Sequence, residues 1–185
     1  MNVDRRRAMI TATLAALVAS PAKALAQSRV PLLYRIAEVQ AVLAAARALV
    51  TTDVLATFVT VDAEGRPRAR TVLVSPPDDD LTLWIGTRGG SRKLDQLGQN
   101  PAATLHFSDD ANGAYASLMG EARVYRDEAV IAVKNPYKGE ELQAFFPNFP
   151  RDFVLLGFRP TWIEVMAKGL PGTAETWQPQ GLAVA

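Results

Sequence analysis

The spacing of apolar residues changes once along this chain, and the change separates one helix from a series of short strands. Over residues 32–50 the apolar positions recur every three or four residues, which predicts a single amphipathic helix. From residue 55 onward they form short β-branched or alternating runs, separated by Gly, Pro, Asn and Asp. The pattern predicts strands at 55–61, 66–75, 81–86, 103–108, 114–125, 153–158 and 161–167.

Short helical stretches interrupt these strands. One is expected over residues 91–98, and another begins near Asp127, which has the side chain of an N-cap. Residues 134–151 are rich in Pro, Gly and aromatics and are expected to form helical turns and loops, and 169–185 an irregular tail. Strands that follow one another without strand–helix alternation predict an antiparallel, barrel-like domain with few helices.

The first 26 residues have the composition of an export signal. Three arginines, Arg5 to Arg7, precede an apolar stretch that is short for a membrane span, and Ala24-Leu25-Ala26 forms a small-residue cleavage site. The paired arginines resemble a twin-arginine signal, although Arg5 stands where that signal prefers Ser or Thr. We therefore expect a periplasmic or secreted protein that starts at Gln27. The alternatives are an uncleaved anchor and an arginine-rich signal of the general secretory route.

Charge and composition argue against several classes of function. The 185-residue chain has a net charge of +1, but its leader carries +3, so the remainder carries −2 and has no basic field for nucleic acid. No apolar stretch of membrane-spanning length follows the leader. With no cysteine and one histidine, we do not expect a zinc site. That histidine, His106, is the one available base and sits in an expected strand, so we do not expect a serine triad either. We assign no metal ligand and no catalytic residue.

The segment 85–93 is the most informative, because it places basic residues where a helix begins. Arg88, Arg92 and Lys93 lie near the positive end of a helix dipole, which costs a few tenths to about 1 kcal/mol for each cation. A bound anion reverses that sign, and phosphate is the usual one. The alternative is an N-cap at Ser91 with solvated basic side chains.

A second basic cluster lies on one expected strand. Arg66, Arg68 and Arg70 alternate along it and therefore share one side. Arg70 lies nearest the apolar part of the strand, so its charge needs a partner. A guanidinium fork suits phosphate, but a salt bridge to Asp62 or Glu64 explains the same pattern.

These segments together resemble the pyridoxamine 5′-phosphate oxidase-like family of flavin-binding split barrels, and residues 55–127 resemble its general-stress-protein branch. The resemblance is carried by Arg70-Thr71-Val72-Leu73, by the run from Gly86 to Lys93, by Asn100-Pro101 and by Gly120-Glu121-Ala122. It implies a mainly β (α+β) domain over residues 27–168, a six-stranded antiparallel split β-barrel with flanking helices. It also implies a homodimer with FMN in clefts at the subunit interface.

By the same resemblance, Arg70, Arg92 and Lys93 hold the FMN phosphate, and the backbone of Val72 and Leu73 faces the isoalloxazine ring. The expected cofactor-binding set is Arg70, Thr71, Val72, Leu73, Gly86, Thr87, Ser91, Arg92, Lys93 and Tyr115.

The sequence departs from the vitamin oxidases of this family at three positions, and it shows no Arg-x-His-type substrate element near its C-terminus. Tyr115 stands where they have a glutamine, Ser75 where they have a substrate-contacting lysine, and Met166 where they have a tryptophan. We therefore expect an exported FMN-dependent oxidoreductase with another, unidentified substrate. The alternatives are a non-catalytic flavin- or ligand-binding module, and a split barrel that binds a deazaflavin or haem.

Overall fold

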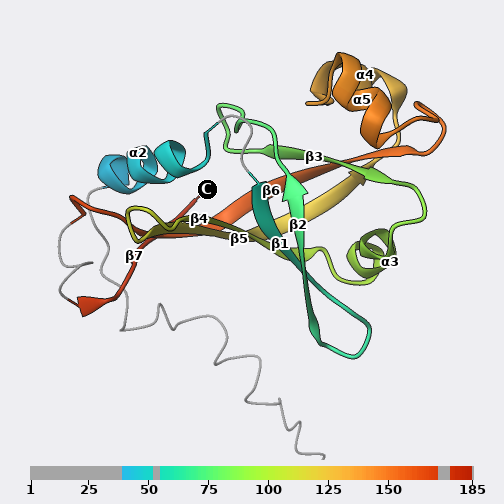
Figure 1. Cartoon of the computed structure of the whole chain (residues 1–185). Coiled ribbons are helices and arrows are strands. Elements are labelled where there is room, and N and C mark those ends of the chain that lie inside the picture. Colours follow the sequence, from blue (N-terminus) through green and yellow to red (C-terminus); the bar gives the residue numbers. More distant parts are fainter. Residues whose placement is uncertain (1–38, 52–54, 171–175, 185) are drawn as a thin grey trace, which may run out of the picture. The chain divides into compact units, whose positions relative to one another are not determined.

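The computed structural model describes residues 39–51, 55–170 and 176–184, and its elements follow the order expected from the sequence (Figure 1). The predicted export signal, residues 1–26, and the first part of the predicted helix, residues 32–38, lie outside the described residues. The helices are α2 (Val39–Leu49), α3 (Arg92–Gln99), α4 (Glu128–Lys134) and α5 (Gly139–Phe145). The strands are β1 (Leu55–Val61), β2 (Pro67–Leu73), β3 (Leu83–Arg88), β4 (Ala102–Asp109), β5 (Ala114–Tyr125), β6 (Phe153–Met166) and β7 (Gln180–Ala183).

All strand pairs are antiparallel and belong to one sheet, in the order β2-β1-β4-β5-β6-β3, with β7 added to β6. The two end strands are not joined by a ladder, so the sheet is not closed. Just after β2, however, the backbone N–H of Ser75 donates to the carbonyl of Trp84 in β3 at 2.9 Å, and the Trp84 N–H donates to Ser75 Oγ at 2.8 Å. The predicted six-stranded antiparallel fold with flanking helices is confirmed, with β7 as an additional strand.

Two sequence predictions near the end of the chain are wrong. Residues 153–158 and 161–167 form one strand, β6, and not two. The pairing of β5 with β6 shifts register between Met119 and Gly120, and this bulge accommodates Pro160, which has no N–H for a regular ladder. Gly120 is required there, because a Cβ on it would lie 2.0 Å from the carbonyl oxygen of Arg159.

The expected irregular tail instead contains β7, which pairs with residues 162–165 of β6. Leu182 of this strand is buried in the main core, and that burial fixes the tail on the sheet. Strand β7 has four residues and few apolar side chains, so its sequence alone does not predict a strand. It forms because it pairs with β6.

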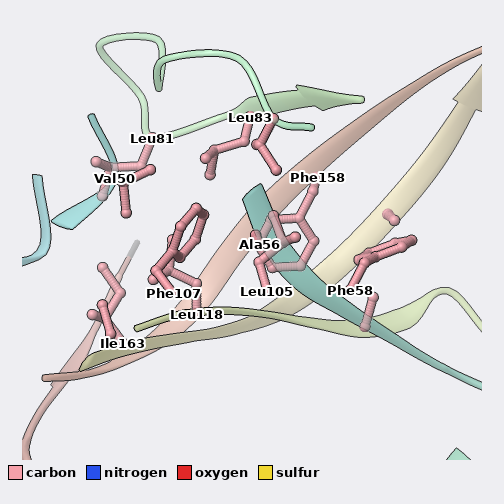
Figure 2. Packing of buried hydrophobic residues seen from close by; sticks show 14 of the residues in the cluster. Val50, Ala56, Phe58, Leu81, Leu83, Leu105, Phe107, Leu118, Phe158 and Ile163 are labelled. Carbon is pink, nitrogen blue, oxygen red and sulfur yellow. The ribbon is translucent and has the colours of Figure 1, made fainter. Parts of the chain in front are cut away.

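The main core lies on one face of the sheet and is built by alternation along the strands. Ala56, Phe58 and Thr60 of β1 are buried, while the residues between them are exposed or half-buried. Figure 2 shows Phe58, Leu105, Phe107, Leu118, Phe158 and Ile163 packing together from four strands, with Val50 beside them. Val42 and Ala46 of α2 join this cluster, so the observed part of the predicted amphipathic helix covers the sheet as expected.

A second apolar cluster lies on the opposite face of β3 and β6, under the two short helices. It contains Trp84, Ile131, Tyr137, Phe146, Phe153 and Leu155. Helix α4 begins at the predicted cap, since Asp127 accepts hydrogen bonds from the N–H groups of Ala129 and Val130. In the part of the chain that the structure describes, no helix is long and apolar enough to cross a membrane.

Candidate functional site

Arg70 points from β2 toward β1 and α3, where neutral groups hold its guanidinium. Nη1 donates to the carbonyl of Phe58 at 3.2 Å and to Thr60 Oγ1 at 2.7 Å, and Nη2 donates to Gln96 Oε1 at 3.0 Å. Its central carbon also lies 5.8 Å from the centre of the Phe58 ring. A guanidinium has five N–H groups, so Nε–H and one N–H of Nη2 stay available to a ligand.

Lys93 lies in the first turn of α3 and turns back toward the end of β3. Its Nζ donates to Thr87 Oγ1 at 2.7 Å and to Ser91 Oγ at 2.5 Å, which leaves one of three N–H groups. The side chain of Ser91 therefore accepts from Lys93 and makes no N-cap hydrogen bond to α3. Ser91 thus occupies the expected N-cap position, but its hydroxyl accepts a hydrogen bond from Lys93 and does not cap the helix.

Arg92, the exposed neighbour of Lys93, lies beside Arg70 and completes a group of three cations. Burial lowers the pKa of Arg70, and the positive charge of Arg92 lowers it further. Burial also lowers the pKa of Lys93, with a smaller effect from Arg70. None of the three forms an ion pair with a carboxylate of residues 39–51, 55–170 or 176–184. The described residues thus hold three mutually repelling cations together without an anion among them to pair with.

The other two arginines of β2 do have acidic partners, so the salt-bridge alternative is right for them and wrong for Arg70. Arg66 Nε lies 2.9 Å from Asp62 Oδ2, and a guanidinium nitrogen of Arg68 lies 2.7 Å from the same oxygen. Arg66 also pairs with Glu64. Although desolvation opposes it, hydrogen bonds from the Arg66 backbone and from both guanidinium groups lower the pKa of Asp62. Asp62 is therefore occupied by Arg66 and Arg68, and within the segments that the structure describes Arg70 has no counter-ion.

Arg88, which the charge pattern grouped with Arg92 and Lys93 near the helix start, is held by the end of α5. It ends β3, and its Nη2 and Nε donate to the carbonyl oxygen of Phe145 at 3.0 and 3.3 Å. Phe145 is the last residue of α5, where the negative end of a helix dipole favours a cation. Arg88 therefore links the end of β3 to the end of α5 by hydrogen bonds.

A pocket of about 360 Å³ is lined by Lys93, one of the three cations. The end of β2 (residues 71–73), the end of β3 (residues 86–88) and Lys93 form one part of its wall. Tyr137, Phe145 and Phe146 form another part, so that the wall is aromatic on the side of α4 and α5. A neighbouring hollow includes Ser91, and a third, of about 290 Å³, includes Arg70 and Arg92.

Nine of the ten predicted cofactor-binding residues line one of these three hollows, and the first two hollows share Thr87, Arg88 and Lys93. The tenth, Tyr115, lines none of them. Its ring lies 5.5 Å from that of His106, and His106 Nδ1 lies 2.8 Å from Ser117 Oγ. These three half-buried residues share the face of β4 and β5 that is turned away from the main core. A single chain therefore does not place Tyr115 with the others.

The aromatic residues of this wall and Gln96 were not predicted from the sequence. Tyr137 is 5% exposed, and burial raises its pKa to about 12. Its hydroxyl donates to the carbonyl of Leu73 at 3.3 Å, which ties the helical segment to the end of β2. The aromatic content of residues 134–151 was the available signal, but it did not indicate which ring would face the pocket. Gln96 gave no signal at all, since its partners lie on two distant strands.

No group of three or more His, Cys, Asp or Glu side chains suited to a metal ion occurs among the residues with a described placement. The donors present around the pocket are instead N–H groups of cations and hydroxyl groups. Such a set fits a phosphate, which accepts several charge-assisted hydrogen bonds at once.

A protein-family model and a curated relative match the sequence. The model described as pyridoxamine 5′-phosphate oxidase matches residues 42–167. A pyridoxine/pyridoxamine 5′-phosphate oxidase from Acidothermus cellulolyticus is 33% identical over 93 residues, which cover 50% of this chain and 35% of that protein. The chain therefore spans about a third of the curated relative it matches.

Solved structures share the fold at low sequence identity. A protein related to general stress protein 26 from Clostridium acetobutylicum has a TM-score of 0.59 at 17% identity, covering 70% of this chain and 85% of that one. General stress protein 26 from Bacillus anthracis strain Sterne has a TM-score of 0.58 at 18% identity, covering 76% and 96%.

Solved structures that are named after different cofactors also share this fold. One is an FMN-binding, pyridoxamine 5′-phosphate oxidase-related protein from Nostoc punctiforme, with a TM-score of 0.51 at 19% identity, covering 80% of this chain and 95% of that one. A heme-binding protein from Mycobacterium smegmatis has a TM-score of 0.55 at 16% identity, covering 75% of this chain and 56% of that one. An F420 reductase has a TM-score of 0.50 at 18% identity, covering 63% of this chain and 94% of that one. These likenesses establish the fold and leave the cofactor open. Because the family model matches well over half of the sequence, the chain belongs to the pyridoxamine 5′-phosphate oxidase family.

Proposed function

We propose that this protein binds FMN and acts as a flavin-dependent oxidoreductase on a substrate that differs from pyridoxamine 5′-phosphate. One observation supports the proposal above the others. Arg70, Arg92 and Lys93 lie together, and none of them has a carboxylate partner among the described residues. A phosphate dianion at this place offsets the repulsion among the three cations and accepts their remaining N–H groups.

The chain's own part in this function is to bind and orient the cofactor. The three cations hold the phosphate, and the backbone of Val72 and Leu73 supports the flavin ring in the adjoining pocket. Tyr137 holds the carbonyl of Leu73 and closes the pocket on the side of α5. Bound FMN supplies the electron transfer, for which no side chain of the protein is required.

We also propose that two copies of the chain form the complete site. Tyr115 lies outside the pocket of its own chain, on the face of the sheet opposite the core. A contact between Tyr115 and a flavin, as the family resemblance implies, therefore requires a second subunit. The proposed active form is a homodimer with the cofactor between the subunits.

The proposed site of action is the periplasm or the cell exterior. The twin-arginine route carries folded proteins, often with their cofactor inserted, and it suits a flavoprotein whose leader contains Arg6 and Arg7. Replacing both residues with lysine is expected to retain the protein inside the cell. Export that continues unchanged contradicts the proposed route.

The central experiment is to purify the protein without adding flavin and to record its absorbance spectrum. The expected result is a yellow protein that releases FMN on denaturation. A colourless protein that also fails to bind added FMN contradicts the proposed function. Bound FMN that no nicotinamide or other reductant can reduce instead indicates a flavin-binding module without turnover.

A deazaflavin is the second candidate cofactor, because F420 also carries a phosphate and one structural neighbour is an F420 reductase. The three cations suit either cofactor. Haem has less support, since the single histidine, His106, lines none of the hollows around the cations. The bound cofactor is first removed. Parallel titrations of the flavin-free protein with FMN, F420 and haem then distinguish the three by their dissociation constants.

A further inference from the structure

Helix α3 places an uncharged amide against the guanidinium of Arg70. We propose that Gln96, together with Thr60, is a positioning residue for the phosphate site, since the two fix the direction of the Arg70 guanidinium. This inference rests on the proposed function, because it assigns to Arg70 a phosphate ligand. It adds two residues, one on α3 and one on β1, that neither the sequence pattern nor the family resemblance assigned to the site.

The contacts form a closed set of three side chains. Thr60 Oγ1 donates to Gln96 Oε1 at 2.6 Å and accepts from Arg70 Nη1 at 2.7 Å. Gln96 Oε1 accepts a second bond, from Arg70 Nη2 at 3.0 Å. Arg70 is thus held at two nitrogens, while β1 supplies a third contact through the carbonyl of Phe58. A long side chain that otherwise has many rotamers is restricted to one direction.

The donor count fixes the orientation of the Gln96 amide. The Thr60 hydroxyl and the Arg70 guanidinium both donate hydrogen bonds to this amide, so its oxygen faces them. Its NH₂ group therefore points away from both. No hydrogen bond of that NH₂ group occurs within the described parts of the chain. Gln96 also lines the hollow of about 290 Å³ that contains Arg70 and Arg92. Gln96 therefore lies beside the same space as the two arginines.

The absence of charge on Gln96 and Thr60 is what makes them suited to this role. A carboxylate at the same place would orient Arg70 equally well, but it would also neutralise the charge that a phosphate needs. Thr60 is fully buried, and its hydroxyl both donates and accepts within the set, so it has no unmet hydrogen bond. Neutral acceptors keep the guanidinium in place and leave its full positive charge for the ligand.

The test measures the affinities of the full-length protein for FMN and for riboflavin, which lacks the phosphate. Gln96→Leu removes both accepted hydrogen bonds without adding charge. Gln99→Leu, at the exposed last position of the same helix, is its matched control. Thr60→Val removes the buried hydroxyl at constant shape, and Thr60→Ser restores it. Thermal unfolding of every variant shows whether each one is folded.

We expect Gln96→Leu and Thr60→Val to weaken FMN binding about tenfold or more, the effect of losing one charge-assisted hydrogen bond to the phosphate. Riboflavin binding should change less than about twofold. Gln99→Leu and Thr60→Ser should retain the wild-type ratio of the two affinities. If Thr60→Val does not fold, the comparison of Gln96→Leu with Gln99→Leu still decides the question.

Two outcomes overturn the inference alone, and one overturns the proposed function as well. If Gln96→Leu changes neither affinity, Arg70 needs no positioning. If it weakens FMN and riboflavin binding by the same factor, Gln96 has only a general structural role. If the wild-type protein binds neither FMN nor riboflavin, the proposed function fails, and the positioning role fails with it.

Discussion

Tyr137 lies directly against Gly86, on the side of β3 that faces α4 and α5. A Cβ on Gly86 would lie 2.4 Å from the Tyr137 ring and 2.7 Å from the Phe153 ring. The glycine of β3 is therefore required by the aromatic cluster, and its role at the pocket is to admit Tyr137. This contact joins the edge of the pocket to the helical segment that covers it.

Gly86→Ala is expected to destabilise the protein by about 1–3 kcal/mol, the usual cost of forcing extra volume into a packed cluster. The measurement is the free energy of unfolding in urea. Gly90→Ala is the matched control, because nothing lies within 4 Å of a Cβ at that position. Equal stabilities of the two variants would show that Tyr137 does not pack on Gly86.

The ionisation of Tyr137 predicts how stability depends on pH in the alkaline range. Burial raises its pKa from 10.0 to about 12. Since the folded protein favours the protonated phenol, its contribution is fully present below about pH 10 and is lost as the pH rises toward 12. A rise of the pKa from 10.0 to about 12 corresponds to about 2.7 kcal/mol of stability at neutral pH.

Urea unfolding at a series of pH values between 8 and about 11 tests this expectation. The wild-type protein should lose stability with rising pH, and Tyr137→Phe should lose less over the same range. Parallel curves for the two proteins would mean that another group causes the alkaline dependence.

The sequence predicted local features well, because they depend on neighbouring residues. The strands at 55–61 and 114–125 and the Asp127 cap follow from alternation and from capping chemistry within a few residues. In contrast, β7 and the continuous β6 depend on pairing with distant segments. Pro160 lies inside β6, and a proline at that place predicts two separate strands from the local sequence. The strand continues because the bulge in β5 accommodates the proline, and that bulge is not visible in the sequence of β6.

The candidate site divides in the same way. The clustered cations were visible as a sequence pattern, but the choice between a phosphate and a salt bridge for Arg70 depended on which arginines Asp62 binds. Gln96 reaches Arg70 from 26 residues away, and Tyr137 reaches Leu73 from 64 residues away. Contacts over such separations arise from the fold and have no spacing rule in the sequence.

The three cations predict a cofactor affinity that depends strongly on the phosphate. Arg92→Ala combined with Lys93→Ala should weaken FMN binding by about 1.5–3 kcal/mol for each charge-assisted bond lost, while riboflavin binding changes little. Raising the salt concentration should lower the FMN affinity of the wild type more than that of the double variant. Equilibrium titration of the flavin-free protein with FMN, at low and at high salt, measures the effect of the substitutions and the effect of salt.

The control for this double variant is Arg123→Ala, an exposed arginine of β5 that lies outside the three hollows near the cations. It removes a positive charge without removing a proposed phosphate contact. If the double variant keeps the wild-type affinity for FMN, the phosphate binds elsewhere, and the interpretation of the cation group is wrong.

The position of Tyr115 predicts that residues of two subunits complement each other. Tyr115→Ala alone should weaken flavin binding, because an aromatic contact to the flavin is lost. In a mixed dimer of Tyr115→Ala with the Arg92→Ala, Lys93→Ala double variant, a contact across subunits leaves one site with both defects and the other with none. A contact within one subunit leaves a defect in both sites.

Flavin titration of the separated mixed dimers distinguishes these arrangements. We expect about half of the sites to bind FMN with wild-type affinity, although each parent homodimer binds weakly. The expectation follows from the place of Tyr115 beside His106, on the opposite side of the sheet from the core and outside the hollows lined by the cations. Mixed dimers without a wild-type site would place Tyr115 with its own chain's cofactor, and a protein that remains monomeric would remove the proposed interface altogether.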